Sequence, residues 1–481
     1  MQRRDVIKGM AGGAFALGLA GCQGTASGLQ ARQAPGDVDV DVIVVGAGLA
    51  GLAAARTLEA GGARVQVLEG ANRIGGRLHT VERGGIRFEV GGVQVGDGYE
   101  RLRTHAQAVG VRIVPPDLDI DMAGVGMVFD DTIVTNKQWP ESPHNTLQGR
   151  ERAILPPMLM RAAMQGLALP ASQSWRDPAK LALDVPFSQH LAAQGWSRQA
   201  IEWMDVGAGY SSLETVSTLD VLRRDAVLRQ GKPGFGFVEG GSQALPVAMA
   251  ASLARRPALE AVVTRVESSG RGVIVHCADG RRFNARRLVL AIPSGPLSRI
   301  RFEPAPPQAQ SAMWAARGMN PVTAVHLRPT RKFWESDGLP LMLWSEGALG
   351  QVLPIRNKDK QVERLIVWLN GASALKADKL DRDARIAAVI AEMERVRPAS
   401  KGALEGLETR SWGSDPLVGG AYAEIAAGQF PQVLEWNTRA FGRIHFAGEH
   451  TGFDHPGVEA ALASGVRAVV EISDSITRPG T

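Results

Sequence analysis

The stretch that decides the fold is residues 38–51, which read VDVDVIVVGAGLAG. Its β-branched run predicts a buried strand, and residues 52–60 have the composition of a helix. Between them, Gly46, Gly48 and Gly51 form a G-x-G-x-x-G pattern. The first glycine permits a tight turn, the second lets the backbone approach a pyrophosphate, and the third lets the helix pack on the strand. The stretch therefore predicts a Rossmann-like unit that holds phosphate at a helix N-terminus.

An acidic residue stands at the distance that this unit needs. Residues 64–68 predict a second strand, and Glu69 ends it 18 residues after Gly51. A carboxylate there is placed to accept hydrogen bonds from ribose hydroxyls. NAD, NADP and FAD share the pattern, so these residues alone leave the adenine dinucleotide open.

Arg73-Ile74-Gly75-Gly76-Arg77 follows directly and points to one nucleotide. The chain here resembles the flavin-containing amine oxidases, which include monoamine, polyamine and L-amino acid oxidases. The resemblance implies that FAD is the cofactor and that Arg77 neutralises its pyrophosphate.

Further matches to this family occur in order along the chain. The resemblance implies that residues 89–96 pass beside the flavin, that residue 263 holds the adenine by its backbone, and that residues 412–422 flank the isoalloxazine. Residues 446–465 match the carboxy-terminal flavin motif, where a strand and a helix N-terminus supply a carboxylate and amides that stabilise reduced flavin. The cofactor-binding residues implied by these matches are Gly92, Val93, Val263, Trp412, Gly448, Glu449, Gly457 and Val458.

The aromatic cage of the family is altered in this chain. Covalent monoamine oxidases carry a cysteine before the first cage aromatic, and the pair here reads Ala421-Tyr422. We therefore expect non-covalent FAD, with Tyr422 offering an aromatic face to the amine. The second cage position aligns with Gly457, so Phe453 or a tryptophan is the expected replacement.

Two other family positions are also substituted. Counting back from a Phe-Trp pair places Ala324 where many members carry a lysine linked to reaction with oxygen. His326 shares that strand face and is the candidate catalytic replacement, although a lone strand histidine is more often structural. L-amino acid oxidases grip the substrate carboxylate with an arginine, and the aligned residue here is Gln94. An amide cannot form the charged pair, but an arginine from another segment could serve.

The resemblance implies an α/β fold with a discontinuous Rossmann-like FAD-binding domain and an α+β substrate domain that has a mixed sheet and a helical insert. The FAD-binding domain is expected at residues 38–115, 236–300 and 411–475. The substrate domain is expected at residues 116–235, which read as helical, and 301–410.

The amino terminus predicts export. Arg3-Arg4 ahead of the uncharged residues 9–21 looks like a twin-arginine signal, and Leu19-Ala20-Gly21-Cys22 resembles a lipobox. The first 22 residues would then be a signal that leaves Cys22 lipidated, or an ordinary signal in which Cys22 has no special role. Residues 23–37 have too little apolar content to fold and read as a tether. We expect a protein on the periplasmic side of the membrane, held by a lipid anchor and not spanning the bilayer.

The composition and the motifs together predict an enzyme. A formal net charge of +5 over 481 residues gives no electrostatic footprint for nucleic acid, and the chemistry needs no metal. We expect hydride transfer from the α-carbon of a small-molecule amine to flavin N5, followed by hydrolysis of the iminium to carbonyl and amine. Oxygen or a periplasmic electron carrier would be the acceptor. The alternatives are an L-amino acid oxidase and a catalytically silent flavin-binding lipoprotein.

Overall fold

The computed structural model describes residues 39–116, 119–120, 124–169, 173–229, 231–232, 234–455 and 457–477. The export signal, Cys22 and the tether predicted from the sequence lie outside these residues.

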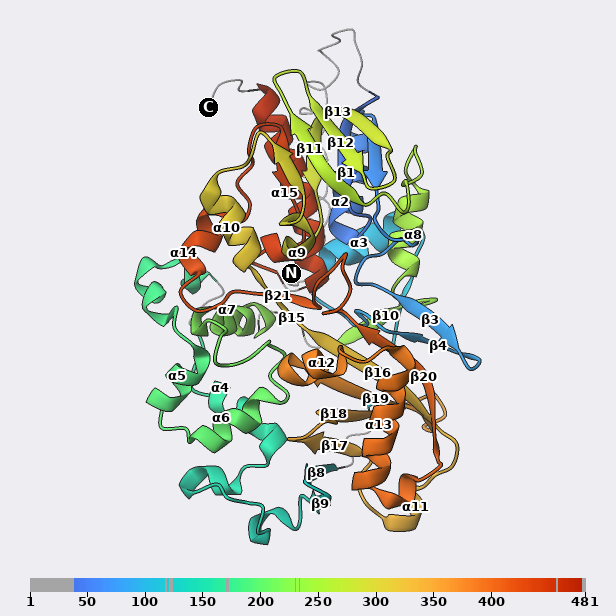
Figure 1. The fold of residues 1–481 in the computed structure, drawn as a ribbon, viewed down its shortest axis with the longest axis vertical. Coiled ribbons are helices and arrows are strands. Elements are labelled where there is room, and N and C mark those ends of the chain that lie inside the picture. Colours follow the sequence, from blue (N-terminus) through green and yellow to red (C-terminus); the bar gives the residue numbers. More distant parts are fainter. Residues whose placement is uncertain are drawn as a thin grey trace, which may run out of the picture.

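A seven-stranded sheet forms one end of the molecule, with β1 (Val40–Val45) inside it (Figure 1). β1 pairs in parallel with β2 (Val65–Leu68) and β13 (Arg282–Leu290), and β13 also pairs in parallel with β22 (Ile444–Phe446). The sheet continues from β13 through β12 (Val273–Cys277) and β11 (Val263–Ser268) to β14 (Arg301–Glu303). Three separate parts of the chain thus build one sheet, which confirms the predicted discontinuous Rossmann-like fold.

Two helices pack together against this sheet. α2 (Leu49–Ala60) contacts α15 (Gly457–Thr477), the last helix of the chain (Figure 1). Small residues allow the close approach, since a Cβ on Gly465 would lie 2.3 Å from the carbonyl oxygen of Ala50. The first and last parts of the domain are thereby packed into one hydrophobic core.

An eight-stranded mixed sheet forms the other end of the molecule. Its strands run in the order β20 (Leu404–Ser411), β16 (Val322–Pro329), β19 (Val362–Asn370), β18 (Gln351–Arg356), β17 (Met342–Ser345), β8 (Val125–Phe129) and β9 (Thr132–Thr135), with β7 (Asp119–Ile120) paired to β18. β17 and β8 are parallel and the other pairs are antiparallel. The predicted mixed sheet is therefore present.

Residues 116–235 are not purely helical, and that part of the prediction was wrong. Their apolar run at residues 125–129 turns at Asp130, whose φ is +52°, and pairs back on itself as the β8–β9 hairpin. The helices of this region are α4 (Leu159–Met164), α5 (Phe187–Ala193), α6 (Arg198–Asp205) and α7 (Thr218–Arg229). They share a hydrophobic core with β8 and β9.

Short strands and helices complete the fold. The two-stranded sheets are β3 (Thr80–Arg83) with β4 (Ile86–Glu89) and β15 (Gly318–Asn320) with β21 (Tyr422–Glu424), and a third small sheet has the order β5 (Val95–Gly96), β10 (Phe235–Val238) and β6 (Ile113–Val114). The remaining α-helices are α3 (Glu100–Ala108), α8 (Ala244–Ala251), α9 (Ser294–Leu297), α10 (Gln308–Ala316), α11 (Trp334–Asp337), α12 (Gly371–Ala377), α13 (Arg382–Val396) and α14 (Phe430–Trp436). Short 3₁₀ helices are η1 (Trp139–Glu141), η2 (Gly149–Ala153), η3 (Pro156–Met158), η4 (Ser174–Arg176), η5 (Pro178–Leu183), η6 (Pro398–Ser400) and η7 (Glu449–Thr451).

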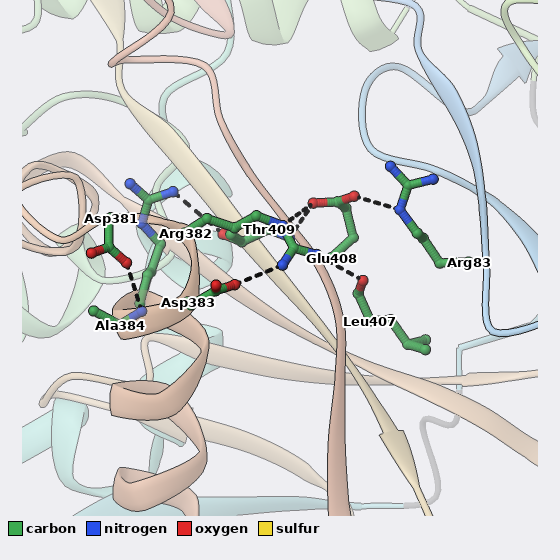
Figure 2. A network of polar contacts seen from close by, with 9 residues as sticks. Arg83, Asp381, Arg382, Asp383, Ala384, Leu407, Glu408 and Thr409 are labelled. Carbon is green, nitrogen blue, oxygen red and sulfur yellow. Dashed lines mark hydrogen bonds and ion pairs between the residues drawn. The ribbon is translucent and has the colours of Figure 1, made fainter.

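A polar network connects the β3–β4 hairpin to the eight-stranded sheet (Figure 2). Glu408 on β20 accepts hydrogen bonds from Arg83 on β3 at 2.9 Å and from Arg382 on α13 at 3.2 Å. Asp381 caps α13 by accepting from the Ala384 N–H at 2.9 Å, and aspartate is among the residues favoured at this position. One carboxylate thus holds a hairpin of the first domain against a helix and strand of the second.

No helix within the described ranges is long and apolar enough to cross a membrane. Across the same ranges, no group of three or more His, Cys, Asp or Glu side chains is arranged to hold a metal ion.

Candidate functional site

A cavity of about 350 Å³ lies at the carboxyl ends of four parallel strands. Gly46 follows β1, Glu69 follows β2, Ala291 follows β13 and Gly448 comes shortly after β22, and all four residues line the cavity. Open α/β sheets bind their ligands at this edge. The other end of the cavity reaches β16 and β19 of the eight-stranded sheet through residues 322, 324 and 368. The cavity therefore extends between the two sheets.

The three motif glycines have three different environments. Gly46 has φ +105°, and a Cβ on it would lie 2.6 Å from the Ala291 carbonyl oxygen. A Cβ on Gly51 would lie 1.9 Å from the carbonyl oxygen of Gly46, so this glycine allows α2 to pack on the turn. A Cβ on Gly48 would meet nothing within 4 Å, and Gly48 itself lines the cavity at the start of α2. Space is thus left beside Gly48 for a ligand to approach the backbone.

Glu69 is buried and holds the turn by both carboxylate oxygens. Oε2 accepts from the Ala47 N–H at 2.7 Å and Oε1 from the Ala71 N–H at 2.9 Å. Burial raises the pKa of Glu69, and the two backbone hydrogen bonds and the nearby Arg73 oppose that rise. Each carboxylate oxygen has a second acceptor site, so Glu69 can still receive a ribose hydroxyl.

Arg77 and Glu449 join distant parts of the chain inside the cavity. The Arg77 Nη1 donates to Glu449 Oε2 at 2.9 Å and to the Ala421 carbonyl oxygen at 2.8 Å. All three residues line the cavity. Gly448, with φ +135°, sets the direction of the chain into Glu449, and its N–H donates to Ser464 Oγ at 2.8 Å. The cavity thus holds a cation and an anion that are paired with each other.

The N-terminus of α15 also faces the cavity, because Gly457 and Val458 at its first turn line it. Gly457 has φ +42°, a conformation that favours glycine. The first amides of a helix have no partner within the helix and favour negative charge. This end of the cavity is suited to an electron-rich group.

Trp412 forms a wall of the cavity and is fixed at both ends. Its Nε1 donates to the Val90 carbonyl oxygen at 3.0 Å, and the guanidinium carbon of Arg410 lies 4.1 Å from its ring centre. Arg410 also pairs with Asp415, and all of these residues line the cavity. The indole is therefore a rigid, flat surface.

Tyr422 on β21 lines the cavity and is 38% exposed. The guanidinium carbon of Arg224 lies 6.0 Å from its ring centre and 4.9 Å from that of Tyr210. Burial raises the pKa of Tyr422, and Arg224 and Arg77 oppose this. Arg224 and Tyr210 were not predicted from the sequence, because they belong to none of the motifs. The scarcity of tyrosine, three in 481 residues, is the one signal that could have drawn attention to Tyr210.

Residues 49–473 match the sequence family described as flavin containing amine oxidoreductase. The chain belongs to this family. It is 28% identical to an L-amino-acid oxidase of Mus musculus over 459 residues, which cover 90% of this chain and 71% of the relative. It is 24% identical to an L-amino-acid oxidase of Naja atra over 466 residues, covering 91% and 89% of the two chains.

Two solved structures have the same fold. The cyclohexylamine oxidase of Brevibacterium oxydans superposes with a TM-score of 0.71 at 21% identity, covering 92% of this chain and 100% of the other. Putrescine oxidase bound to putrescine gives a TM-score of 0.69 at 23% identity, covering 91% and 99%. The chain is thus a flavin-dependent amine oxidoreductase with the fold of this family.

Several residues predicted from the sequence are not among those that line the cavity. Val93 and Gln94 are exposed in the loop before β5, and Val263 is half-buried on β11. Phe453 packs against Trp175, with ring centres 5.6 Å apart, in the core beneath the first sheet. A motif match follows the order of residues along the chain, whereas the direction of each side chain depends on tertiary packing.

His326 is also absent from the cavity lining. It is 1% exposed on β16, its ring centre lies 4.8 Å from that of Phe88, and neither ring nitrogen has a partner in the described chain. Burial, with a smaller contribution from Arg364, lowers its pKa to about 3. Ala324, two residues earlier on the same strand, does line the cavity. The step of two residues along β16 thus takes the imidazole away from the cavity.

His450 lines the cavity and was not among the predicted site residues. It is 4% exposed, and its Nδ1 is buried without a hydrogen-bond partner among the described residues. Burial lowers its pKa to about 3, and Arg317 and Arg77 lower it further, so the ring is neutral. Its place in the Gly448-Glu449-His450 motif was the signal that could have identified it.

These residues fit a flavin cofactor. Space is left beside Gly48, and within the described residues no side chain caps the first turn of α2 and His450 Nδ1 has no partner. The cavity thus offers unfilled volume and unsatisfied polar groups. Trp412 and the first turn of α15 add a flat wall and a site for negative charge.

Proposed function

We propose that the flavin is FAD and that the protein oxidises a small-molecule amine beside Tyr422. The observation that carries this proposal is that one cavity contains the dinucleotide motif at Gly48, the Arg77–Glu449 pair and the ring of Tyr422. The relatives named as amine and amino acid oxidases support the reaction class.

The chain itself provides the groups that would hold FAD. The amides of α2 and Arg77 would contact the pyrophosphate, and Glu69 would accept from the ribose. The cavity lining that the structure describes contains Ala421 and no cysteine, and Cys277 is buried in a separate core. This supports non-covalent binding, because no thiol of the described residues lines the cavity.

When bound, the flavin would supply the acceptor for a hydride from the α-carbon of the amine, which leaves as an iminium that water hydrolyses. Tyr422 would present its ring to the amine and orient the C–H bond. The α15 amides would stabilise negative charge at their end of the cavity. Trp412 and the buried His450 would exclude water from the walls.

The electron acceptor and the location form a second part of the proposal. The cavity lining contains no lysine among the described residues, and the position counted for one carries the methyl group of Ala324. This supports slow reoxidation by oxygen and transfer to a periplasmic carrier. Such a carrier would fit the exported, lipid-anchored protein that the amino terminus predicts.

An anaerobic titration of the purified protein tests the proposal. We expect the yellow protein to bleach with at least one amine in a panel of mono-, di- and polyamines and amino acids, and to regain colour faster with an artificial electron acceptor than in air. A flavin that stays oxidised with every compound would instead favour the silent flavin-binding lipoprotein. A colourless protein that takes up no FAD would refute both.

A further inference from the structure

Arginines gather at the amino end of the seven-stranded sheet, where the described chain begins. Asp39 is fixed there, because its N–H donates to the Asn284 carbonyl oxygen at 3.1 Å and its side chain accepts from the Asn284 N–H at 3.3 Å. Figure 1 shows the start of β1 and the end of α15 at this end of the molecule, away from the eight-stranded sheet. The arginine cluster around this point consists of Arg64, Arg271, Arg286, Arg287 and Arg443.

Arg443 connects two segments of the arginine cluster. Its Nε donates to the Ser269 carbonyl oxygen at 3.0 Å, and its Nη2 donates to that of Gly270, in the turn between β11 and β12. Its Nη1 donates to the Arg286 carbonyl oxygen on β13 at 3.4 Å. Arg271 is exposed in the same turn. Since the partners of Arg443 are carbonyl oxygens and not carboxylates, its charge is held in place but not neutralised.

Arg287 brings a second positive charge close to that of Arg443. The two residues belong to the paired strands β13 and β22, where the Leu288 N–H donates to the Arg443 carbonyl oxygen at 3.0 Å. Burial lowers the pKa of Arg287, and the charge of Arg443 lowers it further, with no contribution from a carboxylate of the described chain. Like charges held together without a counter-ion repel each other, so an anion brought to this surface would be stabilised.

The aspartates at this end do not balance the arginines. Asp41 is shared by two of them, because it accepts from Arg64 Nε at 3.2 Å and its other oxygen lies 3.6 Å from Arg286 Nε. Asp39 accepts from a backbone N–H, and Asp474, near the end of α15, has a partner of its own. Even with all three aspartates counted, the five arginines leave a surplus of two positive charges.

We propose that the arginine cluster docks on the anionic phospholipid headgroups of a membrane. This goes beyond the proposed function and rests on the location proposed with it. Residues 23–38 would join the lipidated Cys22 to the cluster, and a tether of 16 residues spans about 20–25 Å on average. The tether would keep the cluster near the surface, where each arginine adds about a 5-fold preference for anionic lipid. Guanidinium groups suit this partner, because they form two-point contacts with phosphate.

Docking at this end would turn the cavity away from the membrane. The arginine cluster surrounds the start of β1, whereas the cavity lies at the carboxyl ends of the strands. The six residues of β1 separate the two by about 20 Å. The docked protein would therefore take its amine and its electron acceptor from solution and not from the bilayer.

Co-sedimentation with lipid vesicles tests the docking surface. The full chain with Cys22→Ser, which cannot be acylated, is mixed as holoenzyme with vesicles of phosphatidylglycerol and phosphatidylcholine, or of phosphatidylcholine alone. We expect at least 10-fold tighter binding to the anionic vesicles, and loss of this preference at high salt, because salt screens the charges. Inorganic phosphate at equal ionic strength should leave the protein on the vesicles. Displacement by phosphate would show a site for the free anion and overturn the proposal.

Variants of two exposed arginines separate the cluster from the rest of the chain. Arg271→Gln and Arg64→Gln should each weaken binding to the anionic vesicles about 5-fold, Arg271→Glu about 25-fold, and Arg271→Lys should bind like the wild type. The amino-terminal residues are the same in every variant, so differences between variants report the cluster alone.

Arg198 supplies the matched control, because its side chain is 93% exposed on α6 in the other domain. Arg198→Glu makes the same change of charge as Arg271→Glu and should bind like the wild type. Equal binding by Arg271→Glu and the wild type, or an equal loss in both glutamate variants, would overturn the proposal. Vesicle binding needs no turnover, so a protein whose flavin never bleaches would fail the proposed function and still decide the docking surface.

Discussion

Substitution of Gly51 by alanine should destabilise the protein before any cofactor is bound. The added Cβ would lie 1.9 Å from the Gly46 carbonyl oxygen, which is backbone and cannot rotate away. Overpacking of this kind costs ~1–3 kcal/mol or more, against a gain of about 1 kcal/mol in helix propensity. Since the approach is more than 1 Å closer than a normal contact allows, we expect a net loss of roughly 2 kcal/mol. The same shift of α2 should weaken FAD binding about 30-fold.

Gly48→Ala is the matched variant, because a Cβ there meets nothing within 4 Å in the protein itself. The flavin-free protein should lose less than about 1 kcal/mol, the usual effect of alanine at a helix N-cap. FAD affinity should nevertheless fall about 100-fold, because the methyl group occupies the path of the pyrophosphate. Thermal unfolding of both apoproteins and FAD titration by fluorescence quenching measure the two effects. Apoprotein melting of Gly51→Ala at the wild-type temperature, or equal destabilisation by both variants, would refute this account.

Substitutions at three further residues test the site and its surroundings. His326→Leu should keep most of the activity and should lose less stability on acidification than the wild type. Because the pKa of His326 is about 3 in the folded state and about 6.5 in the unfolded state, the wild type loses stability as the pH falls below 6.5. This residue should account for ~2 kcal/mol of that loss between pH 6 and pH 4. Urea unfolding at pH 4 and pH 7 measures this, and a 100-fold loss of activity would restore a catalytic role. Tyr422→Phe should lower kcat/KM a few-fold and Tyr422→Ala about 10- to 100-fold, with the flavin content of both variants unchanged. An alanine variant as active as the wild type would contradict the proposed contact between Tyr422 and the amine. Glu69→Gln should raise the Kd for FAD about 10- to 100-fold, because the amide nitrogen of the glutamine would face the Ala47 or Ala71 N–H. Equilibrium dialysis measures this Kd, and an unchanged value would contradict the prediction.

The sequence was sufficient for the features that depend on local rules. The spacing of the glycines after a β-branched strand predicted the turn at Gly46. The position of Glu69 at the end of the next strand predicted that this acidic residue belongs to the same site. Helix α13 follows the same local rules, since it begins after the Asp381 cap and ends directly before the Arg397-Pro398 pair. These succeed because strand, turn and cap preferences are decided by residues close in sequence.

Other features depend on contacts between distant segments. His326 and Ala324 share a strand face, yet only Ala324 lines the cavity, because β16 continues under Phe88 of the β3–β4 hairpin. The β8–β9 hairpin was missed because its strands are completed by β17, more than 200 residues later. Arg224 belongs to no sequence motif, and only its position beside two tyrosine rings in the folded chain distinguishes it.

The cavity also bears on how the protein is made. Arg77 belongs to the first part of the domain, while Ala421 and Glu449, to which it donates, belong to the last. The groups that would hold FAD therefore come together only after almost the whole chain has folded. A ligand present at 100 times its Kd would add about 2.7 kcal/mol to the stability of that folded state. For the exported protein that we propose, a cofactor supplied inside the cell would be retained only if the chain crossed the membrane already folded around it. A discontinuous site of this kind would need a route that carries folded proteins, such as the proposed twin-arginine route, and not one that threads an unfolded chain.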